Sequence, residues 1–389
     1  MNPIITESKL PLLRFGVIAD VQYADNDDKQ AWYNPTKTRF YRNSLKQVTK
    51  AFEYWESIGR SDGDCPIGFI LQLGDIIDAL SKSICSRSAI DRTLGCFLNN
   101  AKMPTFHTVG NHELYNFNRS ELCHLFDEYL FHHGVHESLN VSHPNVNGMD
   151  MKTLYYRFKP RPGIKFISLD TYDISVLGYD QNHPKYQLAS NVLRSYHHCD
   201  DWNVWDSDKD LNDADKRFQS SNGALSPEQL QWLDAELTES DLMNEMVIVF
   251  GHVGLHPESC GWDSILWNYD QVIDCFNRHE SVVAYFNGHA HNCGYAYDGN
   301  VHYIVLHGII ETPPDIEAFT TVTIHDDHML IDGMGVERKI LASYHKTFAF
   351  DPVVPDYNVQ NHLIRMPITV GLDEYHTEMD IPNTIKIKV

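Results

Sequence analysis

The stretch FGVIADVQYAD, from Phe15 to Asp25, decides how the rest of the sequence is interpreted. An apolar run of strand length ends at Asp20, and Gln22 follows two positions later on the same side of an extended chain. A carboxylate and an amide oxygen placed together in this way can share a metal ion. Histidine binds most transition metals more strongly than an amide does. The glutamine therefore raises the question of which metal would accept it.

Composition narrows the possible partners. The chain has 389 residues and a formal net charge of −22, from 31 Lys and Arg against 53 Asp and Glu. Because nucleic acids and anionic membranes repel such a chain, we expect neither as a partner. An anionic substrate would then need a local source of positive charge, which a bound metal supplies. The 22 histidines make a metal site worth testing.

Targeting signals and cysteine usage indicate a compartment. The N-terminal residues MNPIITESKLPLL lack the basic start and apolar run of a secretory signal. No uninterrupted apolar segment approaches the roughly 20 residues that span a bilayer. The eight cysteines are scattered and form no CxxC pair, as is typical of reduced thiols. We therefore expect a cytoplasmic protein, and we expect it to be a monomer.

The order of apolar segments predicts the fold class. Strand-like runs alternate with helix-like segments, one of them expected from about residue 39 to residue 58. Another helix is expected after Ser226, a good N-cap followed by Pro227. The later strand-like runs indicate mainly antiparallel pairing. This pattern predicts an α/β fold with helices layered on mixed sheets.

Domain organisation is expected to be simple, because the sequence has no internal repeats and no low-complexity linker. We expect one domain over residues 1–389, with residues 345–389 as a C-terminal extension. Residues 172–222 are polar and rich in Asp, Asn, His, Tyr and Trp. So long a loop-like segment is either an insertion near a functional site or a mobile surface excursion.

Five segments place polar side chains directly after an apolar strand. In α/β sheets, ligands gather where the carboxyl ends of strands open into loops. Taken singly, a buried Asp there is often a helix cap and a His is often structural. Four of the five segments carry a glycine just before the polar residue, which suits close backbone approach. The segments are Asp20-Val21-Gln22, Gly74-Asp75, Gly110-Asn111-His112-Glu113, Gly251-His252 and Gly288-His289-Ala290-His291.

These blocks, in this order, resemble the pattern D-x-H, G-D, G-N-H-[ED], H, G-H-x-H of the binuclear metallophosphoesterases. The resemblance covers Phe15 to His291 and implies a sandwich of two mixed β-sheets flanked by helices. Gln22 departs from the pattern, since most members have histidine there. The residue at 78 is Asp rather than the Tyr of purple acid phosphatases, and GDIIDAL lacks the arginine of protein phosphatases. D-x-Q with GNHE resembles the Mn-dependent ADP-ribose/CDP-alcohol diphosphatases.

The resemblance implies two adjacent metal sites that share Asp75. Two divalent ions against two carboxylates would leave the site positive inside an acidic protein. With Gln22, the first metal would have three protein oxygens and one nitrogen, which favours Mn²⁺, with Mg²⁺ as a weaker substitute, over Zn²⁺. Alternatively, Gln22 only hydrogen-bonds a metal-bound water. The implied ligands are Asp20, Gln22, Asp75 and His291 for the first metal, and Asp75, Asn111, His252 and His289 for the second.

The implied reaction is Mn-dependent hydrolysis of the diphosphate bond in nucleoside diphosphate-X compounds by a hydroxide that two metals activate. ADP-ribose would give AMP and ribose 5-phosphate, and CDP-choline or CDP-glycerol would give CMP and the phospho-alcohol. His112 is the candidate catalytic residue, to protonate the leaving oxygen or stabilise the transition state, unless its role is structural. Glu113 either orients a histidine or starts a helix. The alternatives are a phosphodiesterase or phosphomonoesterase on the same scaffold, and a non-catalytic interaction scaffold.

Substrate contacts are expected in the segment AWYNPTKTRFYRN. Trp32 and Tyr33 offer stacking surfaces for a nucleotide base, and Tyr33 is the residue we select. Arg39 and Arg42, three positions apart at an expected helix start, would face a phosphate together. The alternative is that these aromatic residues belong to the hydrophobic core and that the two arginines lie on a solvated face. The expected partner is a small-molecule nucleotide.

Overall fold

Strand β1 (Leu13–Ile18), which ends just before Asp20, lies inside a six-stranded sheet. It pairs in parallel with β4 on one side and antiparallel with β12 on the other. The strand order is β14 (Lys339–Ser343), β13 (His328–Gly335), β12 (Ala318–Ile324), β1, β4 (Phe69–Gln72) and β5 (Thr105–His107). The computed structural model describes residues 10–58, 65–100, 103–126, 141–144, 153–197, 202, 211–348 and 350.

The second sheet also has six strands and mixed pairing. Its inner strands are parallel, whereas β10 and β6 pair antiparallel at the two edges. The strand order is β10 (Tyr295–Tyr297), β11 (His302–Val305), β9 (Val282–Asn287), β8 (Met246–Phe250), β7 (Ile164–Ser168) and β6 (Tyr156–Arg161).

Phenylalanines fill the space between the two sheets. Phe15 and Phe69 of the first sheet stack at 5.3 Å between ring centroids. Phe166 of the second sheet meets both rings edge-on, at 5.2 Å and 5.0 Å. All three side chains are fully buried. Aromatic burial of this extent is a large contribution to stability, and it fixes the two sheets face to face.

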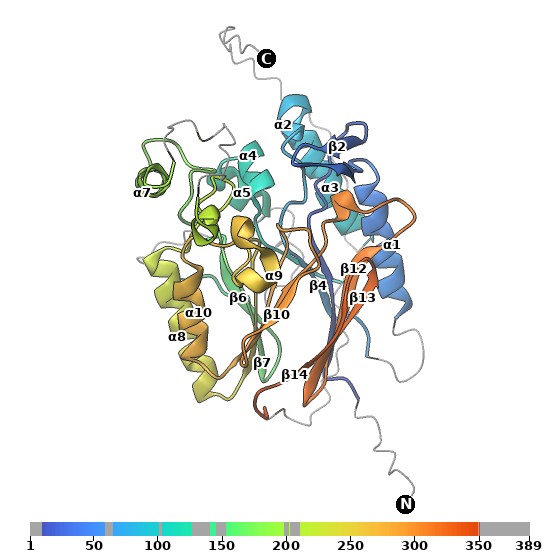
Figure 1. Ribbon diagram of the computed structural model, residues 1–389. Coiled ribbons are helices and arrows are strands. Elements are labelled where there is room, and N and C mark those ends of the chain that lie inside the picture. Colours follow the sequence, from blue (N-terminus) through green and yellow to red (C-terminus); the bar gives the residue numbers. More distant parts are fainter. Residues whose placement is uncertain are drawn as a thin grey trace, which may run out of the picture. The chain divides into compact units, whose positions relative to one another are not determined.

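Helices cover both outer faces of the sandwich (Figure 1). On the first sheet, α1 (Ser44–Ser57) and α3 (Ser86–Asn100) pack together, and Trp55 of α1 donates a hydrogen bond to Thr321 of β12 at 3.0 Å. On the second sheet lie α8 (Pro227–Leu242) and α10 (Tyr269–Asn277). Lys165 of β7 reaches Glu236 of α8 at 3.0 Å. The predicted sandwich of two mixed sheets flanked by helices is confirmed.

Shorter elements connect these layers. A two-stranded hairpin follows β1, and small helices follow most other strand ends. They are β2 (Lys29–Ala31), β3 (Asn34–Arg39), α2 (Ser81–Ile84), α4 (Asn111–Asn116), α5 (Arg119–Phe126), α7 (Pro184–Arg194), η3 (Asp213–Arg217), α9 (Pro257–Cys260), η4 (Trp262–Ser264) and η5 (Ile309–Glu311).

Two helix starts test the sequence expectations directly. The Ser226 side chain accepts a hydrogen bond from the Gln229 amide at 3.2 Å, so the predicted cap of α8 is confirmed. The helix expected from residue 39 is wrong at its beginning, because α1 starts at Ser44. Residues 34–39 instead form β3 and pair with β2.

Three further expectations concern whole-chain properties. Among the described residues, no helix has the length and apolar character needed to cross a membrane. None of the seven cysteines within the described ranges forms a disulfide. Most of the expected C-terminal extension, residues 345–389, lies outside the described part of the chain. The described residues all fall within one compact unit, Met1–Tyr357.

Candidate metal centre

The predicted ligands follow strand ends of both sheets. Asp20 comes after β1, Asp75 after β4 and Asn111 after β5, all in the first sheet. From the second sheet, His252 comes after β8, and the pair His289 and His291 after β9. The parallel strands of each sheet run the same way, so their carboxyl ends open at one edge. All of these donors come from that edge.

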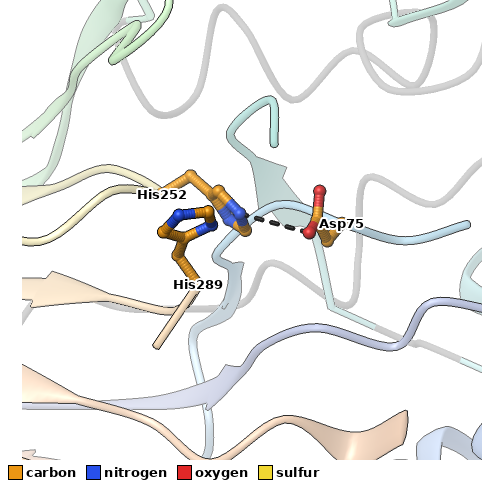
Figure 2. Close-up of side chains that lie close together, drawn as sticks. All are labelled: Asp75, His252 and His289. Carbon is orange, nitrogen blue, oxygen red and sulfur yellow. Dashed lines mark ion pairs between the residues drawn. The ribbon is translucent and has the colours of Figure 1, made fainter. Parts of the chain in front are cut away.

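One group of donors combines a carboxylate with two imidazoles. Asp75, His252 and His289 each offer a ligand atom, and these atoms lie within 4.8 Å of one another. Figure 2 shows the two histidine rings beside the Asp75 carboxylate. His252 Nε2 is 3.3 Å from Asp75 Oδ2. Asn111 Oδ1 lies 3.2 Å from the same His252 nitrogen. We call Asn111, His252 and His289 the His252 group.

A second group adjoins it across Asp75. His291 Nε2 lies 3.0 Å from Asp20 Oδ1. The amide nitrogen of Gln22 is 3.1 Å from Asp75 Oδ2 and 3.2 Å from His291 Nε2. His252 Nε2 is also 4.0 Å from Asp20 Oδ1, which places the two groups side by side. We call Asp20, Gln22 and His291 the Asp20 group.

The backbone at these donors is unusual. Five of the predicted ligands adopt positive φ values, a conformation that residues other than glycine rarely take. Such conformations persist where surrounding structure fixes them and are concentrated at functional sites. A Cβ at Gly110 would lie 2.1 Å from Asp75 Oδ1, so only glycine allows this approach. The five are Asp20 (51°), Gln22 (41°), Asp75 (56°), His289 (64°) and His291 (52°).

Charge is concentrated in this buried site. Burial opposes ionisation of Asp20, but His291 and His252 outweigh it and lower the pKa of Asp20. Burial also opposes ionisation of Asp75. His252 and His112 outweigh it and lower the pKa of Asp75. Burial lowers the pKa of His252, yet Asp75 and Asp20 raise it to about 9. A divalent cation would replace this positive charge between the two carboxylates.

Neutral groups hold the His252 group. His252 Nδ1 donates to the Leu73 carbonyl at 2.6 Å, which leaves Nε2 for a metal. The Tyr172 hydroxyl donates to Asn111 Oδ1 at 3.0 Å. His289 Nε2 lies 2.8 Å from Asn222 Oδ1. Tyr172 and Asn222 are the two ends of the segment expected as an insertion, so both ends contact this group.

Charged groups surround the Asp20 group. Arg39, at the end of β3, donates to the Gln22 side-chain oxygen and pairs with Asp78 at 3.3 Å. Gln22 thus directs its amide nitrogen, rather than its oxygen, toward Asp75. This orientation suits a hydrogen-bond donor in the site, and metal ligation through oxygen requires the flipped amide.

His112 faces the site from the start of α4. The Ala79 amide donates to His112 Nδ1 at 2.8 Å, so the neutral ring carries its proton on Nε2. That Nε2 is 3.8 Å from Asp75 Oδ2. Burial lowers the pKa of His112, which favours the neutral ring. A neutral Nε2–H group suits hydrogen bonding to an oxygen that gains charge during a reaction.

Glu113 supports the loop of Asp75 rather than a histidine. Its carboxylate accepts hydrogen bonds from the backbone amides of Asp75 at 2.9 Å, Ile76 at 2.6 Å and Gly110 at 2.7 Å. Burial and Asp75 nevertheless raise the pKa of Glu113 to about 7. The side chain joins two strand-end loops and also caps α4.

The expected substrate residues lie on or near the β2–β3 hairpin. Tyr33 is 46% exposed, and Trp32 next to it meets its ring edge-on at 5.6 Å. Arg39 and Arg42 do not face a shared position. Arg39 is buried against Gln22, whereas Arg42 is exposed and pairs with Asp25 and Asp27, both at 2.6 Å.

Sequence reasoning missed several residues at this centre. The sequence predicts Arg39 as a phosphate contact, not as a partner of Gln22. Asp78, Tyr172 and Asn222 were not selected as contacts, although each touches a predicted ligand or His112. None follows an apolar strand within one of the five motif blocks, so no local signal marked them.

The donor set fits hard divalent cations. Carboxylate and amide oxygens with a few imidazoles suit Mn²⁺ or Mg²⁺. A second group, Asp234, Cys275 and His279, also places ligand atoms within 4.8 Å of one another. There, Arg278 lies 2.6 Å from Asp234 Oδ1 and supplies the positive charge itself. The strand-end centre is therefore the better candidate.

Comparison with known proteins agrees with this geometry. Residues 13–293 match the family model described as calcineurin-like phosphoesterase. The chain belongs to the calcineurin-like phosphoesterase family. All seven predicted ligands and His112 lie within the matched range.

Relatives of this phosphoesterase carry a more specific name. Proteins from Bos taurus and Homo sapiens, each named manganese-dependent ADP-ribose/CDP-alcohol diphosphatase, are 38% identical to it. The matches cover 88% and 90% of this chain and 97% and 98% of those proteins. A dimetal phosphatase from Danio rerio has a similar crystal structure, with a TM-score of 0.74 and 31% identity over 86% of this chain and 99% of that one.

Proposed function

We propose that this protein hydrolyses the diphosphate bond of nucleoside diphosphate-X compounds with two Mn²⁺ ions. ADP-ribose is cleaved to AMP and ribose 5-phosphate, and CDP-choline or CDP-glycerol to CMP and the phospho-alcohol. The observation that carries the proposal is the 38% identity, over nearly the full length, to relatives named for this activity. The buried carboxylate and imidazole donors support it independently of that likeness.

The residues have separate tasks in this proposal. The Asp20 group and Asp75 hold one cation, and Asp75 and the His252 group hold the other. Bound there, the cations supply Lewis-acid activation of water and neutralise charge on the phosphoryl oxygens. His112 directs its Nε2–H toward the oxygens of the reacting phosphate, because Nδ1 is occupied by the Ala79 amide.

The nucleoside end of the substrate is assigned to Tyr33. Its ring is exposed on the hairpin that follows β1, the strand that ends two residues before Asp20. Stacking of a base on an aromatic ring contributes about 1–3 kcal/mol in nucleic-acid binders. We expect Tyr33→Ala to raise KM for ADP-ribose and CDP-choline and to leave hydrolysis of a small aryl phosphate ester unchanged. Equal losses on all three substrates would show that Tyr33 supports the fold or the metals instead.

Product identity tests the reaction itself. Metal-free protein is supplied with Mn²⁺ and incubated with ADP-ribose, CDP-choline and CDP-glycerol, and products are separated by chromatography. We expect two phosphomonoesters from each substrate and no free phosphate. AMP and a simple phosphodiester are supplied in parallel: phosphate released from AMP alone would indicate a phosphomonoesterase, and hydrolysis of the diester alone would indicate a phosphodiesterase. The absence of turnover with any divalent metal would indicate a non-catalytic scaffold.

A further inference from the structure

A buried carboxylate that no motif contains lies behind the Asp20 group. Glu311 ends the short helix η5, and its side chain is 1% exposed. Its Oε1 lies 3.1 Å from His291 Nδ1. Each of these two atoms is buried and has no hydrogen-bond partner among the described residues. The two atoms are therefore the natural polar partners of each other.

The position of Glu311 beside Nδ1 indicates which nitrogen of His291 faces the metal centre. A carboxylate beside Nδ1 favours the tautomer with its proton on Nδ1, and Nε2 then keeps its lone pair. Nε2 is the atom that faces Asp20 Oδ1 at 3.0 Å. A Cβ at Gly308 would lie 2.6 Å from the His291 ring, so the glycine before η5 permits this close approach.

The other oxygen of Glu311 reaches the β2–β3 hairpin. Lys37 Nζ on β3 is 2.7 Å from Glu311 Oε2. Backbone hydrogen bonds run along the same path: Phe40 donates to the Ile310 carbonyl at 2.7 Å, and Ile310 donates to the Asp20 carbonyl at 3.0 Å. A two-stranded hairpin is only marginally stable alone, so these contacts to η5 help to hold it.

We propose that Lys37 and Glu311 are positioning residues that couple the β2–β3 hairpin to the metal held by the Asp20 group. Lys37 holds the Glu311 side chain in place, Glu311 keeps His291 Nε2 directed at the metal, and metal binding in turn orders the hairpin that carries Tyr33. This inference rests on the proposed metal centre. It adds that the nucleotide-facing hairpin and metal occupancy depend on each other, because coupling of two binding events is reciprocal.

Mn²⁺ binding to the full-length protein tests the first step. Equilibrium dialysis, with free Mn²⁺ measured by electron paramagnetic resonance, gives stoichiometry and affinity without substrate. We expect two ions in the wild type, and in Glu311→Gln one ion bound normally and the other about 10–100-fold more weakly, the usual effect of losing a group that orients a ligand. Lys37→Met should weaken the same ion, and Lys37→Arg should restore it.

Matched variants separate positioning from general damage. Lys29 lies on β2 of the same hairpin and is exposed, so Lys29→Met should leave both ions unchanged. Glu337 is a buried carboxylate that accepts hydrogen bonds from the His307 amide and the Cys293 thiol, and Glu337→Gln should also leave both ions in place. Lys37 is 34% exposed, so its substitution tests the coupling even if Glu311→Gln fails to fold.

Hydrogen exchange of the hairpin amides tests the second step. Mn²⁺ should slow exchange in residues 29–39 of the wild type by at least about fivefold, the lower end of ordinary coupling. The slowing should disappear in Glu311→Gln and in Lys37→Met. Binding of both ions with wild-type affinity by these two variants would overturn the inference while leaving the proposed function intact. A wild type that binds fewer than two ions would overturn the metal centre and this coupling together.

Discussion

The two ligand groups share Asp75 but are held by different kinds of neighbour. The Asp20 group is held by charged side chains, Arg39 on Gln22 and Glu311 on His291. The His252 group is held by neutral ones, the Leu73 carbonyl, the Tyr172 hydroxyl and the Asn222 amide. A hydrogen bond in which one partner is charged contributes about 1.5–3 kcal/mol. Removing a neutral hydrogen bond costs about 1 kcal/mol. Metal binding by the Asp20 group should therefore be weakened more by loss of a supporting residue than metal binding by the His252 group.

The largest expected effect concerns a residue that belongs to neither group. His112→Ala should lower kcat by roughly 10²–10⁴-fold, the usual range for loss of a general acid or base. Both metals should remain bound, because the ligands of both groups are untouched. Metal analysis of the purified variant checks this. Loss of one ion would make His112 a ligand, and the division of the centre into two groups would need revision.

Low pH can lower the stability of the fold as well as release metal from the two ligand groups. The effect of pH on the free energy of unfolding is therefore measured first, on the metal-free protein. Burial lowers the pKa of His107 to about 3, and its Nε2 has no hydrogen-bond partner among the described residues. The unfolded chain takes up this proton below pH 6.5 and the folded chain does not, so stability falls as the pH drops from 6.5 toward 3. Between pH 7 and pH 5 the loss should be about 2 kcal/mol.

Urea unfolding of the metal-free protein at both pH values measures this loss. The variant His107→Leu should show a smaller decrease between pH 7 and pH 5 than the wild type, because it lacks the titrating group. An equal decrease in the two proteins would assign the acid sensitivity to other histidines.

The metal preference of the Asp20 group can be shifted by one residue. Mn²⁺ should restore the activity of metal-free protein far better than Zn²⁺, because oxygen donors dominate this group. Gln22→His adds an imidazole, which Zn²⁺ favours, and should narrow the difference between the two metals by about tenfold. Activity titrations with each metal provide the measurement. Wild-type turnover with Zn²⁺ equal to that with Mn²⁺ would refute the argument from ligand type.

The smallest effect is expected in the His252 group. Tyr172→Phe removes the hydroxyl that contacts Asn111 Oδ1 and should weaken one Mn²⁺ by about fivefold, the equivalent of about 1 kcal/mol. Tyr179→Phe is the matched control, since its hydroxyl donates to the Asp173 carbonyl at 3.0 Å in the same segment. If Tyr172→Phe weakened Mn²⁺ binding as much as Glu311→Gln does, the proposed difference between charged and neutral supporting residues would be wrong.

Local patterns predicted the parts of the molecule that depend on local chemistry. The alternation of strands and helices predicted helices layered on mixed sheets, and the resemblance to the metallophosphoesterases supplied the two-sheet sandwich. Ser226 with Pro227 marked the start of α8. Glycines before the polar residues predicted close approach, which Gly110 shows against Asp75. The start of α1 was missed because Arg39 ends a strand whose pairing depends on the hairpin.

Contacts between distant segments were beyond the reach of those patterns. Lys37 and Glu311 are 274 positions apart, and nothing near either residue indicates the other. Tyr172 and Asn222 lie in a polar segment with no regular spacing of apolar residues. Their contacts with Asn111 and His289 exist only because the second sheet brings β7 and β9 to the same edge as β4 and β5. The tertiary fold, rather than any local preference, selects these partners.

The place of β1 in its sheet has a consequence for biosynthesis. Among the described strands β1 is made earliest, and β4, its parallel neighbour, follows soon after. Its antiparallel neighbour β12 begins only at Ala318. At a translation rate of about 5–20 residues per second, about 250 residues between Gln72 and Ala318 take roughly 12–50 s to be made. During that interval one edge of an apolar strand has no partner, so the nascent chain needs protection from edge-to-edge association until β12 arrives.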